Sequence, residues 1–84
     1  MAYIYIITND INKKVYIGKT NLSIEERFKE HCRDCMKETA EKRPLYAAMR
    51  KYGIEHFSIK KLEYCSSQKA SEREKFWINH YKSY

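Results

Sequence analysis

The stretch that decides the fold is Tyr3-Ile4-Tyr5-Ile6-Ile7, followed after a polar interval by Val15-Tyr16-Ile17-Gly18. Both runs are short and rich in β-branched and aromatic side chains, a composition typical of strands buried on at least one face. The interval between them, Asn9 to Lys14, is a cluster of the polar side chains that favour a chain reversal. Residues 3–18 are therefore predicted to form a β-hairpin whose second strand ends at Gly18.

Two helices are predicted after this hairpin. Ser23 and Glu26 form the S-x-x-E pattern of a capping box, which indicates a helix that continues to about Met36. Pro44 suits the first turn of a second helix, and Gly53 is placed to end it. The apolar positions of this second helix recur at helical spacing, at Leu45, Ala48, Met49 and Tyr52.

A third strand and a third helix complete the chain. Residues 57–64 alternate as a half-exposed strand does, and Ser66-Ser67 precede a helix that reaches about Tyr81. The resulting order, β-β-α-α-β-α, predicts a small α+β domain in which helices pack on an antiparallel sheet.

Length and charge narrow the classes of function. Eighty-four residues are enough for one domain, so residues 1–84 are predicted to form a single unit. Lys and Arg number 17 against 11 Asp and Glu, and this net charge of +6 favours a polyanionic partner. The longest apolar run, residues 1–7, is far shorter than the ~20 residues that a membrane span needs. Three cysteines without an export signal indicate an intracellular protein with reduced thiols.

A carboxylate lies on the predicted apolar face of the last helix. Glu74 shares that face with Ala70, Trp77 and Tyr81, and a buried carboxylate requires a partner. The partner can be an Arg or Lys of another element. Alternatively Glu74 is the ligand of a divalent cation, since Mg²⁺ prefers hard oxygen donors beside phosphate groups.

Four further side chains can carry chemistry. Arg27 and His31 lie four residues apart and so share one face of the first helix. They can be an ordinary solvated pair, or Arg27 can hold a phosphate with His31 beside it for proton transfer. Tyr5 and Tyr16, on the two arms of the hairpin, can be core aromatics, or one can act as a base if a nearby cation lowers its pKa.

The pair Cys32 and Cys35 has C-x-x-C spacing, which invites a zinc interpretation. Zinc needs two more ligands, and Cys65 with a distant His is a poor second pair. Within a helix the two cysteines fall on adjacent turns, so we expect ordinary half-buried residues.

Taken together, these positions resemble the GIY-YIG endonuclease family over nearly the whole chain. The first half of the motif appears as Tyr3-Ile4-Tyr5, with Tyr where the family name has Gly, and the second half appears intact as Tyr16-Ile17-Gly18. An Arg on the first helix, a His four residues on, a Glu in the last helix and a Lys directly after the glycine are matched in this order by Arg27, His31, Glu74 and Lys19.

The resemblance implies a three-stranded antiparallel sheet flanked by three helices and an endonuclease that hydrolyses DNA phosphodiester bonds by in-line attack of water. It implies that Glu74 holds a single Mg²⁺ or Mn²⁺ on the scissile phosphate and that Arg27 binds a non-bridging oxygen. Tyr5, favoured over Tyr16, would orient or deprotonate the water, with Tyr16 hydrogen-bonded nearby and His31 as a proton relay.

The resemblance also gives Lys19 and Gly18 supporting parts. Lys19 would lower the pKa of a tyrosine, and Gly18 would permit a close backbone approach or a positive φ at the strand end. A basic residue of the loop between the first two helices could be Lys42 or Arg43. An Asn that many members have after the last helix would follow Tyr84.

Two other functions remain open from the sequence. A non-catalytic nucleic-acid-binding module would show salt-sensitive binding without cleavage, and a purely structural domain would show neither. A catalytic domain of 84 residues has little surface for base readout, since specific modules bury about 600–1,000 Å² for it. We therefore expect weak or structure-directed DNA recognition, or a separate DNA-binding region.

Overall fold

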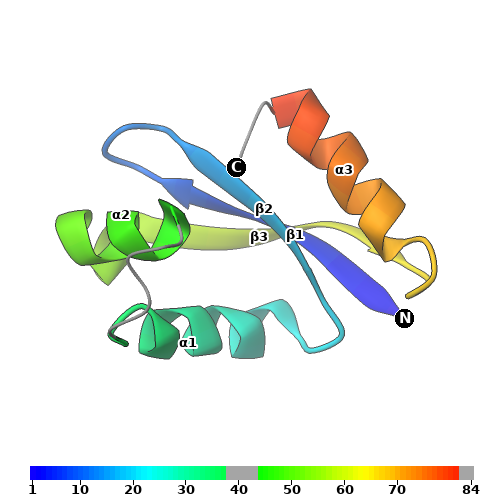
Figure 1. The fold of residues 1–84 in the computed structure, drawn as a ribbon, viewed down its shortest axis with the longest axis horizontal. Coiled ribbons are helices and arrows are strands. Elements are labelled where there is room, and N and C mark those ends of the chain that lie inside the picture. The colour runs from blue at the N-terminus through cyan, green and yellow to red at the C-terminus, as the bar shows by residue number, and fades with distance from the viewer. Residues whose placement is uncertain (38–43, 82–84) are drawn as a thin grey trace.

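The computed structural model describes residues 1–37 and 44–81 (Figure 1). Three strands, β1 (Ala2–Asn9), β2 (Val15–Thr20) and β3 (Phe57–Cys65), form an antiparallel sheet in the order β2-β1-β3. Three helices surround it, α1 (Ile24–Asp34), α2 (Pro44–Tyr52) and α3 (Ala70–Tyr81), and a short 3-10 helix, η2 (Ile54–His56), leads into β3. The predicted element order and α+β class are confirmed. Within residues 1–37 and 44–81, none of the helices has the length and apolar character needed to cross a membrane.

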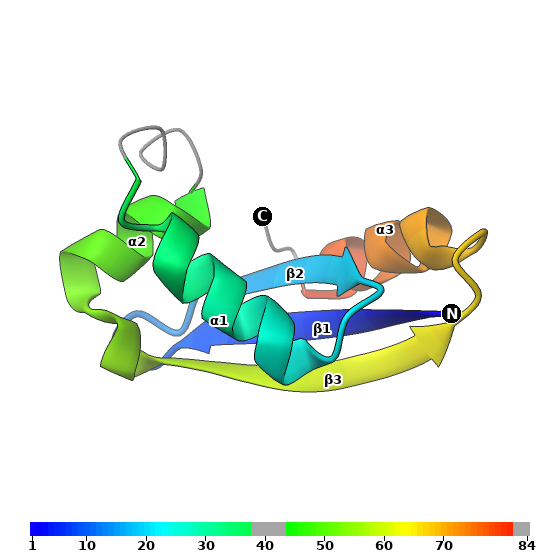
Figure 2. The same cartoon turned by 90° about the horizontal axis from the view of Figure 1, so that it is seen from below.

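The helices cover the two faces of the sheet separately. In Figure 1 the sheet runs between α1 and α3, and Figure 2 shows α1 and α2 on the near side of the strands. Because successive side chains of a strand point to opposite faces, β1 supplies both layers. Tyr5 and Ile7 pack with α1 and α2, whereas Ile4 and Ile6 pack with Ala70 of α3.

The hairpin is longer than its apolar runs suggest. Tyr5 pairs with Gly18 and Ile7 pairs with Tyr16, and the pairing continues to Thr20. The prediction that the second strand ends at Gly18 is therefore wrong, because Gly18 lies inside β2. The polar residues at the end of β2 still pair with β1 through their backbone groups, and the pattern of apolar side chains does not reveal this pairing.

Capping residues, a proline and a glycine determine where α1 and α2 begin and end. The hydroxyl of Ser23 accepts the backbone N–H of Glu26 at 3.2 Å, as a capping residue does, and α1 ends just before Cys35. Pro44 begins α2, and Gly53 closes it with φ of 96° and an N–H that donates to the carbonyl of Met49 at 3.0 Å. A side chain at that φ would be strained, so glycine suits this position.

Helix α3 is attached to β3 by a polar clamp. Arg73 donates from Nε and Nη2 to the two carboxylate oxygens of Glu63, each at 2.8 Å, and Trp77 donates from its indole nitrogen at 3.1 Å. Ala70 is buried against the sheet, and Trp77 is half-buried. Tyr81 was expected on the buried face but is 41% exposed at the C-terminal end of α3, where its ring stacks on Trp77 of the same helix.

Candidate active site

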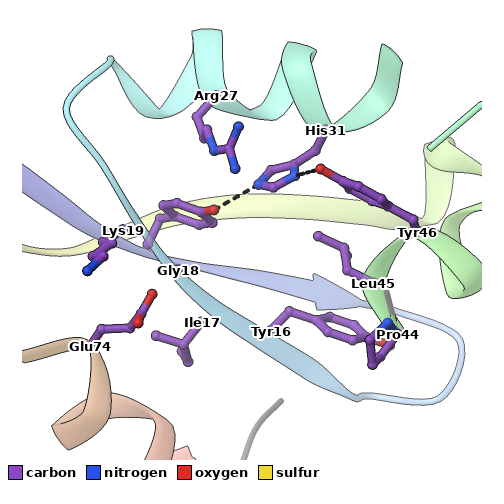
Figure 3. A pocket seen from close by; sticks show the side chains of 11 residues that line it. Tyr16, Ile17, Gly18, Lys19, Arg27, His31, Pro44, Leu45, Tyr46 and Glu74 are labelled. Atoms are coloured by element: carbon purple, nitrogen blue, oxygen red, sulfur yellow. Dashed lines mark hydrogen bonds between the residues drawn. The ribbon is translucent and has the colours of Figure 1, made fainter. Parts of the chain in front are cut away.

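One hollow of about 360 Å³ collects side chains from both strands of the hairpin and from all three helices (Figure 3). Strand β2 is an edge strand, so side chains from both faces of the sheet can meet around it. Every candidate residue predicted from the sequence lines this hollow: Tyr5, Tyr16, Gly18, Lys19, Arg27, His31 and Glu74. We call it the active-site pocket.

His31 is held between two tyrosine hydroxyls. Its Nε2 lies 2.8 Å from the hydroxyl of Tyr5, and its Nδ1 lies 2.8 Å from the hydroxyl of Tyr46 on α2. The imidazole is 4% exposed and both tyrosines are buried as well. In a neutral imidazole one nitrogen donates and the other accepts. One tyrosine hydroxyl therefore donates a hydrogen bond to the imidazole, and the other accepts one from it.

Tyr46 is a site residue that the sequence did not single out. The apolar pattern of α2 placed Leu45 and Tyr52 on the buried side, and Tyr46 fell outside that pattern. In the structure Tyr46 and Met49, three residues apart, are the buried pair, and Leu45 and Tyr52 are only partly buried. The i, i+3 spacing of Tyr46 and Met49 is the signal that could have identified it.

Burial dominates the electrostatics of Tyr5. It raises the pKa of the Tyr5 hydroxyl above its ordinary value of 10.0, and the adjacent Arg27 guanidinium only partly offsets this. The cation that acts on Tyr5 is thus Arg27 rather than Lys19, the residue expected to do so. The Lys19 ammonium instead donates a hydrogen bond to the hydroxyl of Ser71 on α3. Tyr5 consequently enters the pocket as a neutral phenol at neutral pH.

Arg27 is a half-buried cation that interacts with both Glu30 and Tyr5. Its Nη1 donates to Glu30 at 3.1 Å, one turn along α1, and its side chain is 25% exposed. Burial opposes the charge, but Tyr5 and Glu30 together raise the pKa of the guanidinium further above its usual value. Arg27 therefore stays charged, with a planar group of donors in the pocket.

Glu74 is a half-buried carboxylate on the pocket wall formed by α3. Among residues 1–37 and 44–81 the structure gives it neither a hydrogen bond nor an ion pair, so the expected alternative of a structural ion pair finds no partner there. A half-buried carboxylate that lines the same pocket as the Arg27 guanidinium fits a Mg²⁺ or Mn²⁺ ion, which takes one or two protein carboxylates and fills its other positions with water and phosphate oxygens. The described residues hold no cluster of three or more His, Cys, Asp or Glu, so water and substrate would supply those other ligands.

Gly18 lets the Tyr5 ring cross the hairpin. A Cβ on Gly18 would overlap the hydroxyl of Tyr5 and would lie 2.9 Å from a carbon of the Tyr5 ring. The backbone of Gly18 has no positive φ. Of the two reasons expected for a glycine here, the close approach is therefore the one that applies.

No cysteine is among the described residues that line the active-site pocket. Cys35 is fully buried in the core beneath α1, and its Sγ donates to the carbonyl of Cys32 at 3.1 Å. Burial raises the pKa of both thiols. All three cysteines are unbridged. Of the other expectations, Lys42 and Arg43 lie outside the described residues.

The model of the GIY-YIG catalytic domain family matches residues 1–84. The chain belongs to the GIY-YIG family. The catalytic domain of the homing endonuclease I-TevI superimposes with a TM-score of 0.73 at 26% identity, over 98% of this chain and 89% of that one. A glutamate-to-alanine mutant of the I-TevI catalytic domain gives 0.77 at 30% identity, over 98% and 86%. The family and these neighbours confirm the fold and support a nuclease.

Two curated relatives come from Invertebrate iridescent virus 6. Uncharacterized protein 019R is 42% identical over 89 aligned positions, which cover 99% of this chain, and putative MSV199 domain-containing protein 146R is 41% identical over 65, which cover 74%. This GIY-YIG chain spans 30% of the length of the first relative and 24% of the second.

Proposed function

We propose that this GIY-YIG domain hydrolyses DNA phosphodiester bonds with a single Mg²⁺ or Mn²⁺ ion held by Glu74. The observation that supports this most is the convergence of Glu74, Arg27 and Tyr5 in one pocket, although they come from three different elements. A carboxylate to which the described residues give no hydrogen bond or ion pair, a charged guanidinium and a buried phenol can supply metal binding, electrostatic stabilisation and proton transfer in phosphodiester hydrolysis.

Arg27 and Lys19 would bind the scissile phosphate. The Arg27 guanidinium, oriented by Glu30, donates to a non-bridging oxygen and offsets the charge that develops in the transition state. Lys19 adds positive charge at the pocket wall beside Glu74. A divalent ion bound there supplies Lewis acidity toward the phosphate and stabilises the leaving oxygen.

Tyr5 and His31 would move the proton of the attacking water. In the tautomer that we propose, the Tyr5 hydroxyl donates to His31 Nε2 and His31 Nδ1 donates to Tyr46, so that a lone pair of the Tyr5 oxygen is available to the water. As the water attacks phosphorus, its proton passes to the Tyr5 oxygen while the original Tyr5 proton passes to Nε2, and His31 becomes an imidazolium. The raised pKa of Tyr5 favours this concerted transfer over a free tyrosinate. Tyr16, on the same wall of the pocket, would help to position the water.

The decisive experiment is a nicking assay on supercoiled plasmid with Mg²⁺, Mn²⁺ or EDTA. The native chain should convert the plasmid to the open-circular or linear form only with metal. Glu74→Gln and Arg27→Ala should each lose at least about 100-fold in rate, the scale seen when one electrostatic donor is removed. The matched control is Glu72→Gln, an exposed glutamate of the same helix. Full activity of Glu74→Gln would exclude Glu74 as the metal ligand.

The alternative is a nucleic-acid-binding module without catalysis, which the net charge of +6 favours. A salt-sensitive gel shift without metal-dependent conversion would support it. Because the chain spans a minor part of the two viral relatives, we also propose that recognition of a DNA site rests on regions of such proteins outside this domain.

A further inference from the structure

A second hollow of about 270 Å³ lies next to the active-site pocket, between the start of β2 and helix α2. The two hollows share Tyr16 and Pro44 as lining residues, so these two side chains form the boundary between them. The remaining lining residues of this second hollow are Asn12, Lys14, Ala47, Ala48, Lys51 and Tyr52. None of the residues that the structure places around it is an Asp or Glu.

Two exposed lysines are the cationic residues among the described residues that line this second hollow. Lys14 comes from the hairpin and Lys51 from the last turn of α2, so the two cations reach the hollow from different elements. The Lys51 ammonium lies 5.2 Å from the centre of the Tyr52 ring. Small side chains, Ala47 and Ala48, line the hollow between them and leave space for a ligand.

The hairpin turn holds Lys14 in place. The Lys14 N–H donates to the side-chain oxygen of Asn12 at 2.9 Å, and the Lys14 carbonyl accepts from the N–H of Asn9 at 3.0 Å. These two hydrogen bonds fix the backbone from which the Lys14 side chain extends, in a turn where the neighbouring Lys13 has φ of 63°.

We propose that this second hollow binds backbone phosphates of the DNA strand next to the scissile phosphate, through Lys14 and Lys51. The inference rests on the proposed nuclease function, because it concerns how the same substrate continues beyond the active-site pocket. A strand whose scissile phosphate lies at Arg27 would pass over the boundary of Tyr16 and Pro44 into the adjacent hollow, where none of the described lining residues carries a carboxylate. Contacts of this kind fix the position of the duplex without reading bases, which suits a domain with little surface for base readout.

The test measures DNA binding separately from cleavage. A fluorescent duplex oligonucleotide is titrated in EDTA at increasing KCl with the native chain, with Lys14→Gln/Lys51→Gln, and with Lys29→Gln/Lys60→Gln. The control pair removes the same charge from exposed residues of α1 and β3 that line neither hollow. The slope of log K against log salt should fall in magnitude by about 0.9 to 1.8 in the first pair, since each phosphate contact contributes about 0.9, and should stay near the native value in the control pair.

The nicking assay provides the second readout. The Lys14/Lys51 pair should raise KM for plasmid and leave kcat near the native value, and Lys14→Arg/Lys51→Arg should restore KM by restoring the charge. An equal loss of DNA affinity in Lys14→Gln/Lys51→Gln and in Lys29→Gln/Lys60→Gln would overturn the proposal, because it would show a general effect of net charge. A fall in kcat with unchanged binding would also overturn it. A native chain that nicks plasmid while the Lys14/Lys51 pair binds normally disproves this inference alone, whereas a native chain that neither binds nor cleaves DNA disproves the proposed function.

Discussion

The ring of Tyr5 on β1 lies across the backbone of Gly18 on β2, and a Cβ on Gly18 would overlap the Tyr5 hydroxyl. The two residues are direct partners in the antiparallel pair. Tyr5 is 4% exposed and its hydroxyl is bonded to His31, so the ring has little freedom to move aside. The missing side chain of Gly18 therefore determines where the Tyr5 hydroxyl lies in the pocket.

Replacing Gly18 with alanine should displace that hydroxyl. We expect Gly18→Ala to break the hydrogen bond between Tyr5 and His31, to reduce the nicking rate by at least about 10-fold, and to lower the free energy of unfolding by about 1–3 kcal/mol, the usual cost of overpacking. The nicking assay and urea denaturation measure the two effects.

A double-mutant cycle identifies the cause. In a Tyr5→Leu background the side chain is too short to meet the new methyl group, so Gly18→Ala should cost much less stability there. The interaction energy should lie within the range of about 0.5–3 kcal/mol found for residues in contact. An equal cost of Gly18→Ala in both backgrounds would show that the methyl group disturbs something other than Tyr5.

Tyr46 should act as a positioning residue for His31. Tyr46→Phe removes the hydroxyl 2.8 Å from His31 Nδ1 and leaves a buried ring nitrogen without that partner. We expect kcat for nicking to fall while KM changes little, because the imidazole loses its fixed orientation but the phosphate contacts remain. Stability should fall by about 0.5–1.5 kcal/mol, the net contribution of a typical hydrogen bond.

The control for Tyr46 is Tyr64→Phe, which removes a hydroxyl from a tyrosine of β3 that is 51% exposed. It should leave kcat and stability near the native values. A Tyr46→Phe variant that loses stability but keeps its native kcat would show that Tyr46 only packs against His31.

The sequence predicted the parts of the site that depend on local pattern. Two short runs of β-branched and aromatic residues around a polar turn place Tyr5 and Tyr16 on paired strands, and four-residue spacing places Arg27 and His31 on one face of α1. These relationships follow from backbone periodicity, so they could be predicted before the tertiary structure was known. That these residues meet in one pocket was implied only by the family resemblance.

The parts that the sequence did not predict depend on contacts between elements. The rotation of α2 about its axis decides that Tyr46 faces His31, and that rotation is set by packing on α1 and the sheet. In the same way Glu63 of β3 binds Arg73 and Trp77 of α3, whereas Tyr81 at the end of that helix is 41% exposed, and neither result follows from the helical spacing. Helical spacing alone identifies the members of each face but not the neighbour that the face meets.

The clamp of α3 should make stability depend on pH in the acid range. Hydrogen bonds from Arg73, and also from Trp77, lower the pKa of Glu63 below its ordinary value of 4.5. The folded state thus binds the Glu63 proton more weakly than the unfolded state. The stability that this group contributes is present above pH 4.5 and is lost as the pH falls through the lowered pKa. The native chain should therefore lose stability in that window.

Glu63→Gln tests this directly, because glutamine cannot titrate. Urea denaturation followed by the fluorescence of Trp77, the only tryptophan, should show a lower midpoint at pH 7 for Glu63→Gln and a weaker fall toward pH 3 than the native chain shows. Glu72→Gln, an exposed change on the same helix, should keep the native profile. Because Glu74 lies one residue from Arg73, loosening the clamp should also slow metal-dependent nicking at pH 7. Parallel profiles for the native chain and Glu63→Gln would show that α3 is held mainly by its apolar contacts around Ala70.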